Sequence, residues 1–155
     1  MVMSPTRART IQRQPLRPIR VMVVDDHARV RQGLRLFLST CPEMEIVAEA
    51  GGGAEALAHF ARVLPDVVIM DLRTPGMDSP VVTRLMKRVN PSSQIIALAN
   101  EVDPNMERRV LLAGALCCVV KDSSAGALVE AIHKARGVEC SGPMTFIQVK
   151  TGASA

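Results

Sequence analysis

The pattern that most constrains this chain is an alternation of short apolar runs with longer segments whose apolar residues recur at helical spacing. The short runs predict buried strands at residues 20–24, 45–48, 66–70, 94–98 and 117–120. After each run, apolar residues return every three or four positions, as Val30, Leu34 and Leu38 do, which predicts a helix. Parallel strands need such crossover helices, so the sequence predicts a doubly wound α/β fold, a parallel sheet of five strands with five helices.

Two of the predicted helices carry apolar stripes that we expect to face the core. The stripe of the second helix, which Pro65 ends, consists of Leu57, Ala61 and Leu64. The stripe of the third helix consists of Val82, Leu85, Met86 and Val89.

Length and charge limit the number of domains and the class of protein. A chain of 155 residues with 48% hydrophobic residues suits one globular domain. It contains no apolar run of the roughly 18 residues that span a bilayer, so we expect a cytoplasmic protein without membrane contact. Residues 1–20 hold five of the 19 basic residues and no acid, which leaves 14 basic and 15 acidic groups in the rest. We therefore expect residues 1–18 to be a basic, disordered tail.

Charged residues follow three of the five predicted strands. Asp25 and Asp26 follow the first strand, Asp71 the third and Lys121 the fifth, while His27 is the histidine nearest to this group. The carboxyl ends of parallel strands meet at one edge of the sheet, so these side chains should share a cleft. Three carboxylates together favour a hard divalent cation such as Mg²⁺, and a lysine can bind a phosphoryl oxygen. The set predicts phosphoryl transfer to a carboxylate.

The sequence resembles the receiver domain of bacterial two-component response regulators. The resemblance runs from about Ile19 to Arg136 through VVDDH at 23–27, VVIMDLRTPGMD at 67–78, LLAGA at 111–115 and VVKD at 119–122. It implies a flavodoxin-like, CheY-like fold in which Asp71 accepts phosphate and Lys121 contacts the phosphoryl group. Asp25, Asp26, Asp71 and the main-chain carbonyl of Arg73 would hold Mg²⁺. DDHARVRQGL is most similar to the subclass that usually carries a helix-turn-helix output domain.

The resemblance also implies a set of partners. A histidine kinase or a histidine phosphotransfer protein would supply the phosphate, and the chain would catalyse no reaction beyond Mg²⁺-dependent phosphorylation and dephosphorylation of its own aspartate. We expect the receiver to span residues 19–138, and residues 139–155 to form a tail without an output domain. Direct sequence-specific DNA binding is therefore not expected, and the downstream partner would be a protein, with a homodimer as one option.

Two positions depart from the pattern of the receiver family. Ala99 stands where the fourth strand is usually followed by Thr or Ser, and Cys118 stands where the fifth strand usually carries Tyr or Phe. In typical receivers that hydroxyl binds the phosphoryl group and that ring turns inward on activation. A degenerate receiver that binds partners without phosphorylation is therefore the alternative. Thr74 and Ser79 replace the commoner Met and Gly beside the phosphoacceptor loop.

Other interpretations compete with a receiver. Gly51 to Ala56 fits the dinucleotide fingerprint G-x-G-x-x-A, with an acid about 20 residues later. A haloacid-dehalogenase-type phosphatase needs a second acid where Arg73 stands. Asp25 and Asp26 could instead cap the next helix, and Asp71 could be a turn residue.

Overall fold

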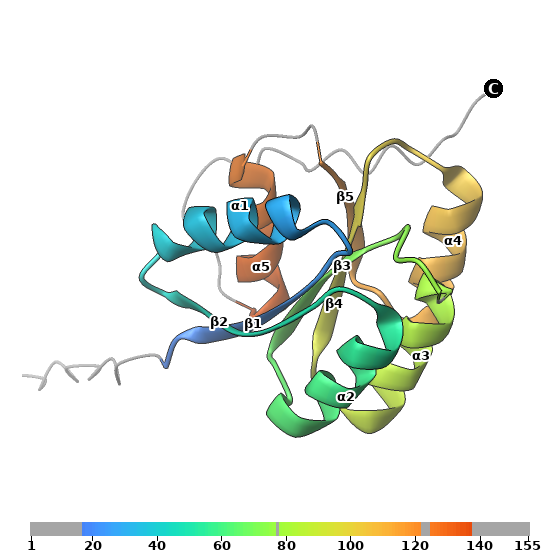
Figure 1. The fold of residues 1–155 in the computed structure, drawn as a ribbon, viewed down its shortest axis with the longest axis horizontal. Helices are drawn as coiled ribbons and strands as arrows, with labels where there is room; N and C mark the ends of the chain where they lie inside the picture. The colour runs from blue at the N-terminus through green and yellow to red at the C-terminus, as the bar shows by residue number, and fades with distance from the viewer. Residues whose placement is uncertain (1–16, 77, 122–124, 138–155) are drawn as a thin grey trace, which may run out of the picture.

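The computed structural model describes residues 17–76, 78–121 and 125–137 (Figure 1). The strands are β1 (Ile19–Val24), β2 (Met44–Ala50), β3 (Val67–Asp71), β4 (Gln94–Ala99) and β5 (Cys117–Val120). The helices are α1 (Ala28–Ser39), α2 (Gly53–Val63), α3 (Ser79–Val89), α4 (Pro104–Ala113) and α5 (Ala125–Ala135). The predicted alternation is confirmed, and the predicted strands differ from the observed ones by at most two residues at an end.

The five strands form one parallel sheet in the order β2-β1-β3-β4-β5. This order confirms the predicted doubly wound fold, and it places the reversal of strand order between β1 and β3. In Figure 1, α1 and α5 cover one face of the sheet, and α2, α3 and α4 cover the other. The ends of β1 and β3 are thus neighbours at the point where such folds bind their ligands.

The central strands are buried on both faces, which is why they are continuously apolar. Met22 and Val24 of β1 belong to the core beneath α2, α3 and α4, whereas Val21 and Val23 belong to the core beneath α1 and α5. Side chains alternate between the faces of a strand, so each strand contributes to both cores. The carboxyl edge of the sheet is thus built on buried strands.

The predicted apolar stripe of α2 faces the core only at Leu57, which is partly buried against it. The buried residues of the helix are Gly53, Ala56 and Phe60, and Phe60 has no exposed surface. Ala61 is exposed, and Leu64 lies beyond the helix in the left-handed region with φ 45° and is 45% exposed. The large Phe60 ring lies one position before Ala61, so burying it turns Ala61 toward solvent while Leu57 stays at the edge of the core.

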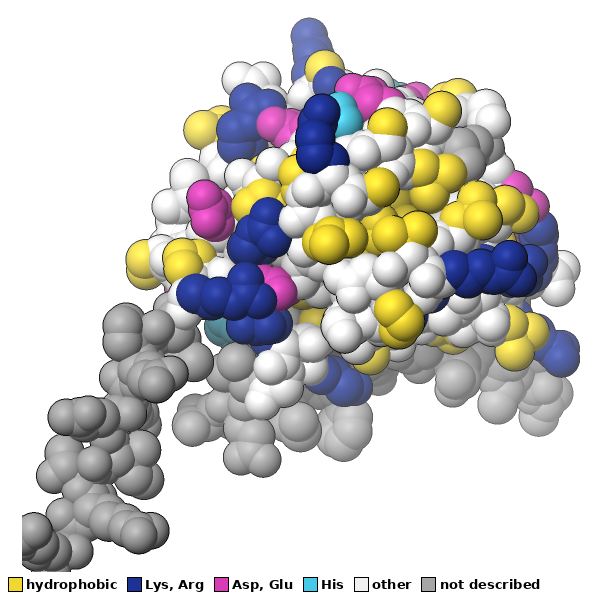
Figure 2. Space-filling view, turned by 90° about the horizontal axis from the view of Figure 1, so that it is seen from below, with side chains coloured by type: hydrophobic (Ala, Val, Ile, Leu, Met, Phe, Trp, Pro, Cys, Tyr) yellow, Lys and Arg dark blue, Asp and Glu magenta, His cyan; other side chains and the backbone are white. Residues whose placement is uncertain are grey.

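Only part of the predicted apolar stripe of α3 is buried against the core. Val82 and Met86 are buried, but Leu85 and Val89 are exposed together with Val81. The view from below, the side on which α2 and α3 lie in Figure 1, shows hydrophobic side chains in the middle of the face and basic ones to either side (Figure 2).

Most of both predicted tails lies outside the described residues. Of the predicted basic tail, Arg17 and Pro18 are described, and Arg17 Nη2 donates to Oδ1 of Asp66 at 2.9 Å. The predicted segment 139–155 lies wholly outside the described part, as does residue 138. Within the described ranges, no helix is long and apolar enough to cross a bilayer.

Candidate functional site

Asp25 lies directly after β1 and is buried, with 1% of its side chain exposed. Its Oδ1 accepts a hydrogen bond from the main-chain N–H of His27 at 2.9 Å, and its Oδ2 accepts one from Lys121 Nζ at 2.9 Å. The first bond fixes the turn into α1, whose N-cap residue is His27. Asp25 therefore combines a local structural role with a charged contact across the sheet.

Asp71 is the last residue of β3, and only 3% of its side chain is exposed. Lys121 Nζ lies 3.4 Å from Oδ1 of Asp71, although this oxygen has no hydrogen-bond partner in the described part of the chain. One ammonium thus lies between the two buried carboxylates. The strand ends bring Asp25, Asp71 and Lys121 into one pocket, as the sequence predicts.

The pKa of Lys121 reflects this position. Burial works to lower the pKa, but the hydrogen bond to Asp25 and the negative charges of Asp71 and Asp25 outweigh it, so the pKa is raised above its ordinary value. The ammonium is therefore charged at neutral pH, in a pocket where three carboxylates would otherwise repel one another.

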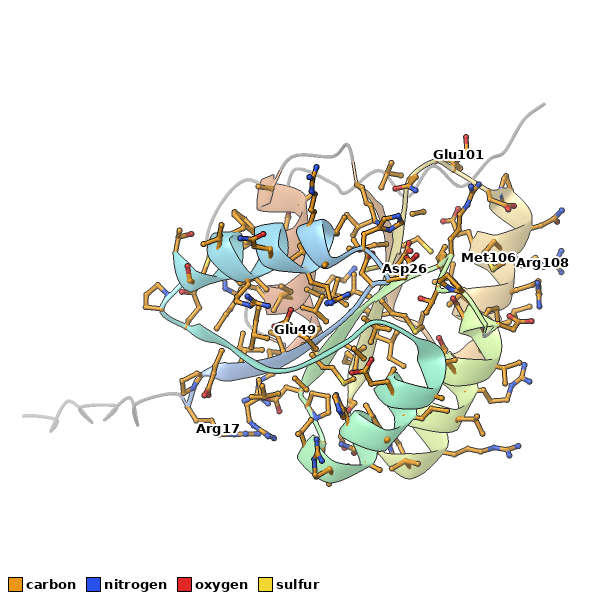
Figure 3. The ribbon with its side chains drawn as sticks, in the orientation of Figure 1. Arg17, Asp26, Glu49, Glu101, Met106 and Arg108 are labelled. Atoms are coloured by element: carbon orange, nitrogen blue, oxygen red, sulfur yellow. The ribbon has the colours of Figure 1, made fainter. Side chains whose placement is uncertain are left out.

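Asp26 lies just beyond the end of β1 (Figure 3), and His27 follows it as the N-cap residue of α1. The side chain of Asp26 is 27% exposed and that of His27 is 65% exposed. His27 Nδ1 lies 3.1 Å from Oδ1 of Asp26 and 3.3 Å from Oδ1 of Asp25. Oδ1 of Asp26 is itself buried and has no hydrogen-bond partner among the described residues. Oδ1 of Asp26 and Oδ1 of Asp71 are thus two buried carboxylate oxygens without a hydrogen-bond donor in the part of the chain that the structure describes.

The donor set fits a hard divalent cation. Carboxylate oxygens are the ligands that Mg²⁺ prefers, and a buried anionic oxygen without a donor is costly unless a cation approaches it. Arg73, whose carbonyl the resemblance assigns to the metal, lies two residues beyond Asp71, and its Nη2 donates to Oε1 of Glu101 at 2.8 Å. Both side chains of this pair are exposed, at 67% and 72%, so the ion pair lies on the surface between the β3–α3 and β4–α4 loops.

Two buried hydroxyls hold the backbone at the end of β3. Thr74 Oγ1 donates to the main-chain carbonyl of Asp71 at 2.9 Å. Ser79 Oγ lies 3.3 Å from the same carbonyl and donates to that of Leu72 at 2.9 Å. Sequence reasoning noted Thr74 and Ser79 only as unusual loop residues and missed these contacts. The available signal was a pair of hydroxyl residues on either side of a Pro-Gly turn.

Ala99 is the last residue of β4 and Cys118 lies within β5, as predicted. Both pack against the core on the side of α4. Ala99 has no side-chain donor, and its carbonyl accepts from the main-chain N–H of Lys121 at 2.8 Å. Burial, helped by the charges of Glu107 and Cys117, raises the pKa of the Cys118 thiol to about 12. Cys118 is therefore a neutral, partly buried thiol.

The glycine turn of the dinucleotide interpretation lies elsewhere. Gly51 to Gly53 follow β2, an edge strand, and not the reversal point between β1 and β3. The N–H of Gly51 donates to Oε2 of Glu55 at 2.9 Å, so a carboxylate of the chain already uses this donor. A bound pyrophosphate would compete with that carboxylate.

Comparisons with known proteins agree with this geometry. The response regulator receiver domain family matches residues 21–133. The transcriptional regulatory protein LiaR of Bacillus subtilis is 38% identical over 117 residues, which cover 76% of this chain and 56% of LiaR. The chain thus spans about half the length of this relative.

Solved structures of receivers have the same fold. The signal receiver domain of the putative response regulator NarL from Mycobacterium tuberculosis has a TM-score of 0.73 and 32% identity, over 78% of this chain and 98% of that one. The isolated receiver domain of RcsB from Salmonella enterica serovar Typhimurium, solved with the phosphomimetic BeF3−, has a TM-score of 0.72 and 25% identity, over 82% and 94%. The chain belongs to the response regulator receiver domain family of two-component systems.

Proposed function

We propose that Asp71 is the phosphoacceptor of this receiver. The observation that carries the proposal is that Lys121 Nζ contacts both Asp25 and Asp71, at 2.9 and 3.4 Å, in a pocket at the reversal point of the sheet. An Asp71 carboxylate oxygen attacks the phosphorus of a phosphohistidine, the bond from phosphorus to the imidazole nitrogen breaks, and the imidazole leaves with its electron pair. The product is an acyl phosphate on Asp71.

Asp25, Asp26, Asp71 and the carbonyl of Arg73 are the residues that would hold Mg²⁺. Oδ1 of Asp26 and Oδ1 of Asp71 have no hydrogen-bond partner among the described residues, which supports this assignment, because a cation can pair with both oxygens. When bound, the ion neutralises charge on the phosphoryl oxygens.

Lys121 forms ion pairs with Asp25 and Asp71 before phosphorylation, and its ammonium can bind the phosphoryl group afterwards. Its ammonium is paired with carboxylates of the chain. A phosphoryl group on Asp71 would bring new negative oxygens toward the same ammonium, which is a point charge on a flexible stem. We propose that this exchange of partners is the first structural response to phosphorylation.

The donor and the output are part of the same proposal. A histidine kinase or a histidine phosphotransfer protein supplies the phosphate in the cytoplasm, and the receiver at residues 19–138 signals through protein contacts, a homodimer among them. The chain performs no other catalysis than its own phosphorylation and dephosphorylation. The BeF3− used with the RcsB receiver supports the use of an aspartyl-phosphate mimic on this chain.

Intact-mass measurement after incubation with acetyl phosphate and Mg²⁺ tests the proposal. We expect one added phosphate on the native chain and none on Asp71→Asn. Asp78→Asn is the matched control, since Asp78 lies in the same loop but is paired with Arg109 on the surface, and it should be labelled like the native chain. A native chain that takes up no phosphate would refute the assignment of Asp71.

A second function, a module that binds partners without phosphorylation, is favoured by one observation. Ala99 offers no hydroxyl to a phosphoryl group and Cys118 offers no ring, so the two groups that usually report phosphorylation are missing. In this case Asp71→Asn would bind the downstream partner as well as the native chain does. Partner binding that requires both Asp71 and acetyl phosphate excludes this alternative.

A further inference from the structure

Exposed apolar side chains gather on the outer surface of α2 and α3. The described part of the chain has seven exposed large hydrophobic residues, and four of them lie on α3 or directly after α2. These four are Leu64, Val81, Leu85 and Val89, and they are 37–55% exposed. Single exposed apolar residues are normal on a protein surface, whereas a cluster of them indicates an interaction site.

The apolar residues of α3 lie on the side of the helix that faces α2. Lys87 lies on the opposite side, because a Cβ atom added at Gly114, the C-cap residue of α4, would be 3.0 Å from Cγ of Lys87. Leu85 and Val89 are each two residues from Lys87, and so about 200° around the helix from it. Val81, one turn before Leu85, continues this row toward the start of α3.

The exposed alanines of α2 lie on the side that faces this row. His59 lies on the other side of α2, toward β2, since its Nδ1 is 3.0 Å from the carbonyl of Glu49. Ala61 is two residues from His59, and so about 200° around the helix from it. Ala61 and Ala58 are both exposed, so the apolar surface continues from α3 onto α2. We call this surface the α2–α3 face, and it consists of Ala58, Ala61, Leu64, Val81, Leu85 and Val89.

Arginines border the α2–α3 face on both sides. Arg62 lies on α2 beyond Ala58, and Arg84 and Arg88 lie on α3 on the side of α4. The three are exposed, and none of them has a hydrogen bond or an ion pair with another described residue. The sequence of α3 contains no acidic residue. Figure 2 shows the resulting arrangement, with hydrophobic side chains in the middle of the face and basic ones to either side.

The basic borders decide which occupant the face fits. A second copy of the chain would bring arginines against arginines, because both borders are basic. A membrane surface favours aromatic anchors, but the single aromatic residue of α2 and α3, Phe60, is fully buried. The row on α3 spans about 12 Å, or roughly two helical turns. A helix with an apolar stripe between acidic residues matches both the row and the charge of its borders.

We propose that the α2–α3 face binds an amphipathic helix of a partner protein, with Asp or Glu on both sides of the apolar stripe of that helix. The stripe packs on Leu85 and Val89, and the acids pair with Arg62, Arg84 and Arg88. None of these residues belongs to the pocket of Asp71, so the inference goes beyond the proposed function and does not depend on it.

Fluorescence anisotropy with synthetic helical peptides of about 16 residues tests the apolar part of the proposal. The probe peptide has Leu at every third or fourth position and Glu on both sides of this stripe, and the reference peptide has the same composition in scrambled order. The native chain should bind the probe at least about tenfold more tightly than the reference. Leu85→Ser should weaken probe binding about tenfold. Leu112→Ser is the matched control, because Leu112 is 77% exposed on α4, and it should change binding less than about twofold.

Charge reversal tests the basic borders with the same probe. Arg88→Glu should weaken binding at least about fivefold, whereas Arg108→Glu, on the exposed part of α4, should change it less than about twofold. Asp71→Asn should bind the probe as the native chain does. Circular dichroism should show that each variant is folded. Amide shifts of the native chain should change on α2 and α3 when the probe is added.

Three results would overturn the proposal. The first is a native chain that binds the probe no more tightly than the scrambled reference. The second is a set of amide shift changes on α4 and α5 that leaves α2 and α3 unaffected. The third is that Leu85→Ser abolishes self-association in sedimentation, or binding to phosphatidylserine vesicles, but leaves probe binding unchanged. Phosphate labelling of Asp71 can succeed in each case, so failure of this inference is distinguishable from failure of the proposed function.

Discussion

Replacing Lys121 with methionine removes the one lysine or arginine that contacts the carboxylates of Asp25 and Asp71 in the described part of the chain. Methionine keeps the length and much of the volume of the side chain. The ammonium it replaces is 2.9 Å from one carboxylate and 3.4 Å from the other, and these carboxylates are 1% and 3% exposed. The expected result is a large loss of stability in the metal-free protein.

The magnitude follows from the burial of the three groups. At an effective dielectric constant of about 20, unit charges 4 Å apart interact by about 4 kcal/mol, and removing one partner of a buried ion pair typically costs about 3–5 kcal/mol. Lys121 is 18% exposed, so we place the loss at the lower end, about 3 kcal/mol. For a domain of this size the melting temperature should fall by roughly 10 °C.

Urea unfolding followed by circular dichroism in EDTA is the suitable assay, since the chain has no Trp or Tyr to report by fluorescence. Lys134→Met, on the exposed part of α5, is the control and should change stability by less than about 0.5 kcal/mol. Adding Asp71→Asn should reduce the cost of Lys121→Met, because one of the carboxylates then carries no charge. Millimolar Mg²⁺ should reduce it as well.

The pH dependence has a defined sign. The pKa of Lys121 is raised in the folded state, so its stabilisation is complete below the ordinary lysine pKa of 10.5 and is lost as the pH rises through the raised value. The stability difference between native chain and Lys121→Met should therefore stay constant from neutral pH to about pH 10. The reasoning is refuted if Lys121→Met costs no more than Lys134→Met, or if its cost does not depend on the charge of Asp71.

Four further predictions concern the switch positions and the core. The Cys118 thiol, with a pKa of about 12, should have roughly a thousandfold less thiolate at pH 8 than a thiol with a pKa of 9.0, so iodoacetamide should label it much more slowly in the folded than in the urea-unfolded chain. Because the unfolded thiol ionises first, Cys118 should also lower the free energy of unfolding as the pH rises from about 9 to 12, and Cys118→Ala should weaken that slope. BeF3− should change the amide shifts of residues 103–120 only weakly in the native chain and more strongly in Ala99→Thr/Cys118→Tyr, so large changes in the native chain would contradict weak coupling. Phe60→Ala should cost about 3–5 kcal/mol in urea unfolding, since Phe60 is fully buried, and a cost below about 1 kcal/mol would mean that α2 packs by another face.

The strands and the charged pocket were predictable because both depend on simple rules. A doubly buried strand must be apolar along its whole length, and the acids that end β1 and β3 must then lie at one edge of the sheet. The buried face of α2 was not predictable by counting apolar residues. Several faces of this Ala-rich helix are apolar, and only the packing of Phe60 decides between them.

The contacts within the site were predictable only as residue types. The pairing of Lys121 with Asp25 joins residues that are 96 positions apart, and that of Arg73 with Glu101 joins residues 28 apart. The sequence shows that residues of opposite charge are present, but it does not show which of them the conformations of the loop side chains bring into contact. For the same reason the approach of His27 to the carboxylates emerges only in three dimensions.

The two hydroxyls that bond to the Asp71 carbonyl fix the β3 side of the pocket more firmly than its β4 side. On the β3 side, Thr74 and Ser79 anchor the backbone from within the protein, where water cannot replace their bonds. On the β4 side, residues 100–103 are exposed, and the salt bridge of Glu101 there is open to solvent and easily exchanged. The backbone at the end of β3 is therefore held by more buried hydrogen bonds than the loop between β4 and α4. We therefore expect a perturbation at Asp71 to move the segment that leads into α4 more than the backbone at the end of β3.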